Sequence, residues 1–269
     1  MFLFAVFVSI PGHIIAAEKP VRICNDSGEW PPYFYFKRLP DGTKSEQLVG
    51  ATVDSFKAIF EKIGLEYQFE LLPWQRCLAM VDRFDKTGNF ELISEAGTST
   101  WRLEHFLKTS EPVYKRTDVF YYNQQRFPNG IQLKSIDDME GYKICVPAGY
   151  SFDRYVEAGL DPELVDVSHK SDYFDVIRKI SLGYCDILPA NLSVVEGAVR
   201  IGRFKLPANV TYTLDQVLGK PFYYYYWIAK TSPRAKQLQT SIDQAIRELK
   251  ADGHWEAIYR KYLSQGSGL

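Results

Sequence analysis

The spacing of hydrophobic residues in the first part of the chain predicts strands and helices in alternation. Residues 21–24 form a short apolar run that is typical of a buried strand. Apolar side chains in residues 53–63 share one face of a predicted helix, and Gly64 suits its end. An alternating strand at residues 67–71, a helix beginning at Pro73 and a strand ending at Ser94 follow. This order predicts a mostly parallel α/β sheet.

The later part of the chain repeats this design and suggests two lobes. Further strands are predicted at residues 142–146, 164–167 and 185–188, and amphipathic helices near the C-terminus. Long aromatic β runs at residues 117–123 and 222–229 are the candidate crossings between the lobes. We therefore predict one lobe from residues 18–116 plus 226–269 and another from 117–225, with a cleft between them.

Several loops that follow predicted strands carry aromatic or polar side chains. Two prolines hold Trp30 and Tyr33 in the loop after the first strand, and Trp74 lies in the turn after the second. Ligands of parallel α/β sheets bind beyond the carboxyl ends of the strands, so these loops are expected to cluster at one edge. The alternative for the Trp30 loop is simple packing over the core.

The polar loop after the third strand has the features of an anion site. Ser99 or Thr100 can cap the helix that begins there, and unpaired N–H groups at a helix start favour a negative ligand. Arg102 adds a planar set of donors that matches a carboxylate. The alternative is a surface ion pair of Arg102 with Glu104 or Glu111.

Composition and charge exclude some classes of function. The 269 residues are 46% hydrophobic and 24% charged, which is typical of a globular protein. The net charge of −1 argues against a nucleic-acid-binding protein, which would carry a basic surface. The four histidines are scattered without metal-ligand spacing, so we expect no metal site. No cofactor is expected either. The 15% aromatic content suits a stacking site as well as a core.

The N-terminus and the cysteines indicate export. Residues 1–17 are apolar and end in small residues, which predicts a secretory signal peptide, although the usual basic start is missing. Four cysteines follow it, and an even number suits disulfides in an oxidising compartment. The protein is therefore expected in the periplasm.

Short motifs in order along the chain resemble the extracellular solute-binding proteins of family 3, the periplasmic binders of polar amino acids. They are EWPPY (29–33), VGATVD (49–54), LPWQRCL (72–78), STWR (99–102), SEPVY (110–114), DDMEGYKICVPAGYS (137–151), LGYCD (182–186) and LKADGHWEAIYRKY (249–262). The resemblance covers nearly all of the chain after residue 17. It implies a type II periplasmic-binding-protein fold, with two α/β lobes joined by two β crossings and a ligand cleft between them.

The resemblance also assigns roles to single residues. It implies that Trp30 and Trp74 stack on the ligand, and that Arg102 grips a carboxylate. Together with the loop residues above, the expected ligand-binding set is Trp30, Tyr33, Trp74, Ser94, Glu95, Gly97, Ser99, Arg102, Gly149, Tyr150, Ser151 and Asn191.

Asn191 departs from the family pattern. It stands where the family has an acidic residue for the ligand ammonium group, and an amide carries no negative charge. Glu95 stands where the family often has Ser and can supply that charge instead. The alternative for Asn191 is a turn residue after Pro189.

The resemblance implies a monomeric binder that captures a small polar ligand by closure of the lobes and delivers it to an ABC-transporter permease. No catalytic residues are assigned. The alternatives are an enzyme like cyclohexadienyl dehydratase, with Glu95 as a general acid, and a sensory or partner-binding protein.

Four cysteines allow three disulfide pairings. We predict Cys24–Cys77 and Cys145–Cys185, because this pairing keeps each bridge within one lobe and leaves the hinge free.

Overall fold

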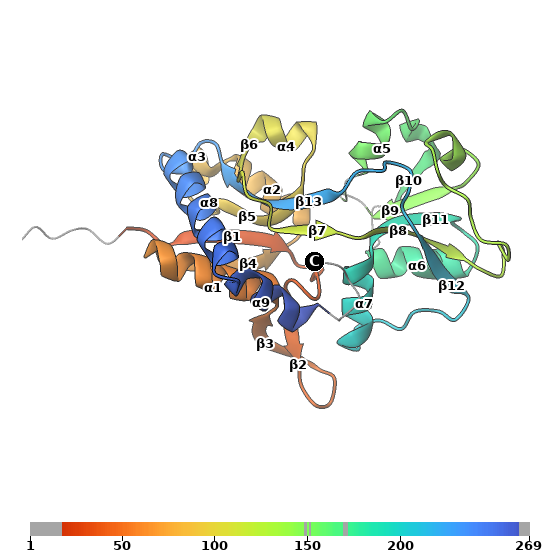
Figure 1. The fold of residues 1–269 in the computed structure, drawn as a ribbon, viewed down its shortest axis with the longest axis horizontal. Coiled ribbons are helices and arrows are strands. Elements are labelled where there is room, and N and C mark those ends of the chain that lie inside the picture. The colour runs from red at the N-terminus through yellow and green to blue at the C-terminus, as the bar shows by residue number, and fades with distance from the viewer. Residues whose placement is uncertain (1–17, 148–149, 151, 169–171, 264–269) are drawn as a thin grey trace, which may run out of the picture.

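The computed structural model describes residues 18–147, 150, 152–168 and 172–263, and it has two α/β lobes side by side (Figure 1). Each lobe is built on its own sheet, called here the first and the second sheet. The predicted α/β architecture is confirmed. The predicted signal peptide, Gly149 and Ser151 lie outside the described residues.

The first sheet has the strand order β4-β1-β5-β13-β6, and β7 also pairs with β13. Its strands are β1 (Val21–Asp26), β4 (Tyr67–Leu72), β5 (Leu92–Gly97), β6 (Phe106–Lys108), β7 (Tyr114–Arg116) and β13 (Phe222–Ala229). β1 is parallel to β4 and to β5, as the alternation of strands and helices predicted. β13 comes from the far end of the chain and runs antiparallel to β5, β6 and β7.

Helices cover the first sheet. They are α1 (Ala51–Ile63), α2 (Trp74–Asp82), α3 (Phe84–Thr87), α4 (Thr100–His105), α8 (Ala235–Ala251) and α9 (His254–Tyr262). The apolar face of α1 buries Phe56, Ile59 and Phe60. Gly64 ends α1 with φ 69°, a left-handed conformation that glycine adopts without strain.

A β-hairpin projects from the first lobe below its helices in Figure 1. It consists of β2 (Tyr35–Arg38) and β3 (Lys44–Val49), which pair in antiparallel fashion. The pattern of hydrophobic residues predicted no strand here, because the mostly polar residues of β3 show no regular apolar alternation.

The second sheet has the order β10-β9-β11-β8-β12. Its strands are β8 (Asp118–Asn123), β9 (Ile144–Pro147), β10 (Val165–Ser168), β11 (Ile187–Asn191) and β12 (Val210–Leu214). The helical segments are α5 (Asp153–Glu157), α6 (Tyr173–Ser181), α7 (Leu192–Arg200) and the short 3₁₀ turns η1 (Asp137–Met139) and η2 (Pro162–Leu164). α6 begins with a capping box in which Asp172 accepts from the backbone N–H groups of Phe174 and Asp175.

The chain passes from the first sheet to the second between β7 and β8, and it returns between β12 and β13. The predicted lobe boundary between residues 225 and 226 falls inside β13, which pairs with β7 from Phe222 onward. The lobe boundaries themselves stay a prediction.

Two disulfides lie in the described part of the chain, and they join the predicted partners. Cys24 on β1 bonds Cys77 on α2, with their Cα atoms 5.8 Å apart. Cys145 on β9 bonds Cys185, just before β11, with Cα atoms 5.9 Å apart. Both bridges connect elements of the same lobe.

The helices in the described ranges are either too short or too polar to cross a lipid bilayer.

Candidate ligand-binding site

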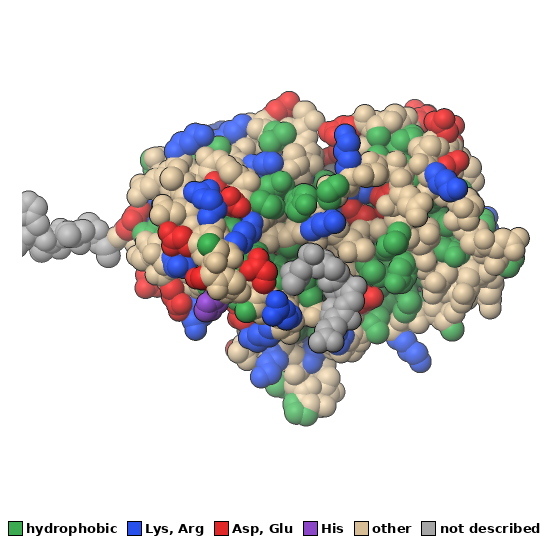
Figure 2. All heavy atoms as spheres, viewed as in Figure 1, with side chains coloured by type: hydrophobic (Ala, Val, Ile, Leu, Met, Phe, Trp, Pro, Cys, Tyr) green, Lys and Arg blue, Asp and Glu red, His purple; other side chains and the backbone are tan. Residues whose placement is uncertain are grey.

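A cavity lies where the two lobes meet. Figure 2 shows apolar side chains gathered where the lobes meet on the face in view. The first lobe lines the cavity with Asn25, Asp26, Trp30, Phe34, Trp74, Glu95, Ala96, Gly97, Arg102, Arg116, Phe222 and Tyr224, and the second lobe adds Tyr150 and Tyr173. Seven of these described lining residues are aromatic, which suits a site that stacks on a flat or apolar group.

Arg102 is a buried cation of this cavity that forms no salt bridge within the described part of the chain. Its side chain follows β5, and Ser99 caps α4 by accepting from the Arg102 backbone N–H at 3.3 Å. Only 6% of Arg102 is exposed, and burial lowers its pKa. One Nη donates to the Gly97 carbonyl at 2.9 Å, whereas Nε has no hydrogen-bond partner in the described structure.

The guanidinium of Arg102 lies 5.7 Å from the ring centre of Trp74. It forms no salt bridge with any described residue, and the lowering of its pKa by burial is only partly offset by the charge of Asp153. Glu111, one of the alternative partners weighed above, instead pairs with Lys250 at 3.1 Å. A buried charge without a partner is costly, and a bound carboxylate would remove that cost.

Glu95 is a buried carboxyl group on β5 that also lines the cavity. Thr52 at the start of α1 donates to one carboxylate oxygen, and the Tyr114 hydroxyl donates to the other at 3.2 Å. Tyr114 in turn accepts from the indole N–H of Trp30 at 3.3 Å. Burial raises the pKa of Glu95 to about 8, so at pH 7 this side chain is mostly neutral.

Asp26 and Asn25 at the end of β1 line the cavity, although the sequence predicted a strand only as far as Cys24. One Asp26 carboxylate oxygen accepts from the Gly28 backbone N–H at 2.9 Å, and the other accepts from the Tyr150 hydroxyl at 2.8 Å. Asp26 forms no salt bridge within the described chain. The sequence feature that could have identified Asn25 and Asp26 is their position at the carboxyl end of the first strand, where ligands of parallel sheets bind.

Arg116 lines the cavity as well, but its charge is already balanced. It pairs with Asp118 at 2.5 Å and donates to the Tyr224 hydroxyl at 3.0 Å. Its guanidinium also lies 5.2 Å from the ring centre of Phe222. These residues lie at the two crossings, and the sequence reasoning missed them because their positions depend on how the crossings pack.

The structure brings Trp30, Trp74, Glu95, Gly97, Arg102 and Tyr150 of the predicted set to the cavity. Four other predicted residues do not line it. Tyr33 stacks on Tyr114 with ring centres 3.9 Å apart. Ser94 accepts from Asn25, and Ser99 caps α4.

Asn191 is fully buried and caps α7, where its side-chain oxygen accepts from the Ser193 N–H at 3.2 Å. Its amide nitrogen has no hydrogen-bond partner among the described residues. Asn191 is therefore at a turn into a helix, and it does not line the cavity.

Within the described ranges, no three His, Cys, Asp or Glu side chains lie close enough together to hold a metal ion.

Solved structures with the same fold include binding proteins and a sensor. A histidine kinase sensor domain with similarity to periplasmic binding proteins is 17% identical, with a TM-score of 0.71 over 91% of this chain and 96% of that one. The amino acid ABC transporter substrate-binding protein AbpA from Streptococcus pneumoniae, bound to L-arginine, is 18% identical, with a TM-score of 0.67 over 90% and 93%.

An ancestral amino-acid-binding protein described as a precursor of cyclohexadienyl dehydratase is 14% identical, with a TM-score of 0.66 over 91% of this chain and 95% of that one. No curated protein matches the sequence. The sequence matches the bacterial extracellular solute-binding proteins, family 3, over residues 23–265. That match spans almost the whole chain and includes both lobes and the cavity between them, so the protein belongs to the bacterial extracellular solute-binding proteins of family 3.

Proposed function

We propose that the protein captures a small carboxylate-bearing solute, an amino acid or an analogue, in the cavity between its lobes. The observation that carries this proposal is Arg102, a guanidinium that is 6% exposed, forms no salt bridge among the described residues and has no hydrogen-bond partner for its Nε there. A ligand carboxylate at this position gains paired, charge-assisted hydrogen bonds.

The charges around the cavity favour a ligand that also carries a positive group. Glu95 is mostly neutral at pH 7, and the charge of Arg116 is balanced by Asp118. Among the described lining residues, Asp26 is thus the acidic side chain left to pair with a ligand cation. A carboxylate has about four lone-pair positions, and the two donors Gly28 and Tyr150 leave room for a further one. We expect Arg102 and Asp26, rather than Asn191, to hold the two charged ends of the ligand.

Binding is proposed to occur by hinge closure. The ligand docks on the first lobe, which carries Arg102, Asp26 and Trp30, and contacts with Tyr150 and Tyr173 of the second lobe favour the closed form. In this scheme the protein is exported by a signal peptide in residues 1–17, acts as a monomer without catalysis, and delivers its ligand to an ABC-transporter permease. The kinship in fold with a sensor domain makes ligand sensing the alternative use of the same site.

A thermal-shift screen with amino acids, small carboxylates and amines identifies the ligand, and titration calorimetry then tests Arg102. Arg102→Ala is expected to weaken binding by roughly 2–5 kcal/mol, which is about thirty-fold to several thousand-fold. Arg102→Lys is expected to recover only part of the loss, because a single ammonium does not reproduce the planar donor set.

Arg247→Ala is the matched control, since this arginine of the same lobe is 53% exposed and lies 3.6 Å from Glu111. It is expected to bind like the parent. Parent-like binding by Arg102→Ala would show that Arg102 is not the anchor.

A second candidate function follows from Glu95. A carboxyl group with a pKa of about 8, lining the same cavity as a carboxylate anchor, is able to donate a proton to a bound ligand. This is the feature expected of a dehydratase like the enzyme named for the ancestral relative. Incubation with prephenate and arogenate, followed by a search for product, separates turnover from binding, and we expect no product.

A further inference from the structure

Three aromatic rings from opposite lobes meet inside the cavity. Trp30 of the first lobe lies 5.5 Å from the ring centre of Tyr150 and 5.3 Å from that of Tyr173, both from the second lobe. The two tyrosine rings are 4.9 Å apart and meet edge to face. This three-ring cluster occupies space between the lobes that a ligand side chain would otherwise use.

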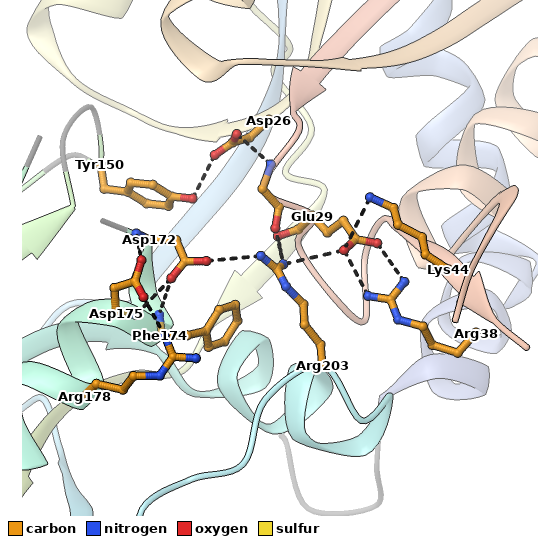
Figure 3. Close-up of polar contacts among 11 residues, drawn as sticks. Asp26, Glu29, Arg38, Lys44, Tyr150, Asp172, Phe174, Asp175, Arg178 and Arg203 are labelled. Atoms are coloured by element: carbon orange, nitrogen blue, oxygen red, sulfur yellow. Dashed lines mark hydrogen bonds and ion pairs between the residues drawn. The ribbon is translucent and has the colours of Figure 1, made fainter. Parts of the chain in front are cut away.

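A hydrogen bond holds one member of the cluster in place. The Tyr150 hydroxyl donates to Asp26 at 2.8 Å, and Figure 3 shows this ring reaching from its own lobe toward the end of β1. Tyr150 is therefore fixed at both its ring face and its polar end. Tyr173 begins α6 directly after the capping residue Asp172, and it is buried.

Direct contacts beside the cavity set how closely the lobes approach. Arg203, which follows α7, donates to the Gly28 carbonyl, and its other Nη lies 3.2 Å from Asp172 (Figure 3). Gly197 of α7 packs so tightly that a Cβ there would lie 2.6 Å from the Pro31 carbonyl. These contacts hold the second lobe against the Trp30 loop. The three rings therefore cannot move apart unless these contacts between the lobes break.

The space that remains is small. About 60 Å³ inside the cavity is open to the centres of water molecules. One water needs about 10–15 Å³ of such space, so the cavity has room for about four to six. That room suits a compact molecule, whereas a long or aromatic side chain would require the three-ring cluster to move.

We infer that the site selects a compact zwitterion, of the size of glycine, alanine or serine, and that Tyr150 and Tyr173 set this upper limit. The inference rests on the proposed function and adds the size class of the ligand. Arg102 and Asp26 supply the charges for such a molecule, and the cluster excludes longer side chains.

The test compares ligands of increasing size by titration calorimetry. The probes are glycine, L-alanine, L-serine, L-phenylalanine and L-arginine, and the proteins are the parent, Tyr173→Ala and Tyr150→Ala. We expect the parent to bind at least one compact probe, and both long probes at least about tenfold more weakly. Removing one ring should raise the affinity for L-phenylalanine by about tenfold or more, because the probe's ring fills the vacated apolar space.

Tyr212→Ala is the matched control, because this tyrosine of the second lobe lies on β12, is 41% exposed and does not line the cavity. It should keep the size preference of the parent. A parent that binds L-arginine or L-phenylalanine as tightly as the compact probes overturns the size inference but leaves the proposed function intact.

A size preference that persists unchanged in Tyr173→Ala and Tyr150→Ala also overturns the inference. If no probe binds the parent, and no other carboxylate does in the wider screen, the proposed function fails together with it. Near-ultraviolet circular dichroism shows whether each variant is folded. The ratio of the parent's affinities for compact and long probes is a test that needs no variant.

Discussion

At the scale of single residues, the contrast between satisfied and unsatisfied buried charges identifies the site. Glu91 is 2% exposed, but Arg234 and Ser232 bind both its carboxylate oxygens. Asp243 is also buried and accepts from backbone N–H groups. Arg102 is 6% exposed, forms no salt bridge with a described residue, and its Nε has no hydrogen-bond partner among the described residues. Because buried charges are normally paired, the exception indicates where a ligand belongs.

The raised pKa of Glu95 predicts that the stability of the protein depends on pH. Its pKa is about 8 in the folded protein against an ordinary value of 4.5. Between these values the folded protein keeps a proton that the unfolded chain loses, so stability falls as pH rises, by about 1.4 kcal/mol per unit. The total loss of stability from Glu95 is about 5 kcal/mol at most. Below about pH 4.5 Glu95 is protonated in both the folded and the unfolded protein, and above about pH 8 it is protonated in neither. Its contribution to stability therefore changes with pH only between these two values.

Urea unfolding of the parent and Glu95→Gln across pH 4.5–8 measures this contribution. We expect the variant to gain stability relative to the parent as the pH rises, because glutamine has no proton to lose. Thr52 and Tyr114, the neighbours of Glu95, are not ionised in this range, so the difference reports on position 95. A difference that stays constant with pH would contradict the raised pKa.

At the scale of elements, the disulfides connect the strands to segments that carry site residues. The Cys24–Cys77 bond ties α2 to β1. α2 begins at Trp74, and β1 ends at Asn25 and Asp26, so the bond connects two walls of the cavity. The Cys145–Cys185 bond lies in the second lobe, and neither of its cysteines lines the cavity.

Removing Cys24–Cys77 by a double serine substitution is expected to lower the free energy of unfolding by roughly 2–4 kcal/mol, because the bond closes a loop with a sequence separation of 53. It should also weaken ligand binding, since Trp74 is then held less firmly. The matched control is the double serine variant at Cys145 and Cys185, with a separation of 40. Urea unfolding and calorimetry measure both, and equal effects of the two variants on ligand binding would argue against a special role for α2.

At the scale of the whole molecule, the lobes contact each other on more than one side of the cavity. Arg203 reaches the Gly28 carbonyl on the α7 side. Arg200 donates to the Tyr262 carbonyl at 2.8 Å. On the α4 side, Thr100 donates to Glu157 at 3.0 Å. Contacts that do not involve ligand therefore favour the closed arrangement, and they lower the cost of closing on a small ligand.

Arg203→Ala should shift the ligand-free protein toward an open form. Small-angle scattering is expected to show a larger radius of gyration than for the parent. Ligand affinity should fall by roughly tenfold, as the fraction of binding-competent protein decreases. Arg178→Ala is the control, because this exposed arginine pairs with Asp175 inside α6 (Figure 3). If Arg203→Ala scatters and binds like Arg178→Ala, the bridge does not influence closure.

The sequence by itself determined features that depend on local order. The apolar period of residues 53–63 and Gly64 predicted α1, and the strand–helix alternation predicted the parallel pairing of β1, β4 and β5. It also predicted both disulfides, and it placed Trp30, Trp74 and Arg102 in the segments that follow strands, with Trp74 and Arg102 near the starts of helices. Such features follow from side-chain periodicity and from the rule that parallel strands end at one edge.

Only the tertiary structure decided which side chains share the cavity. Tyr33 and Trp30 are three residues apart, yet Tyr33 packs on Tyr114 in the core while Trp30 faces Tyr150 and Tyr173. Asp26 ends β1, Arg116 ends β7, and both line the same cavity as Arg102. The neutral state of Glu95 depends on burial that no neighbour in sequence supplies. Long-range packing sets each of these properties, and a local pattern carries no information about it.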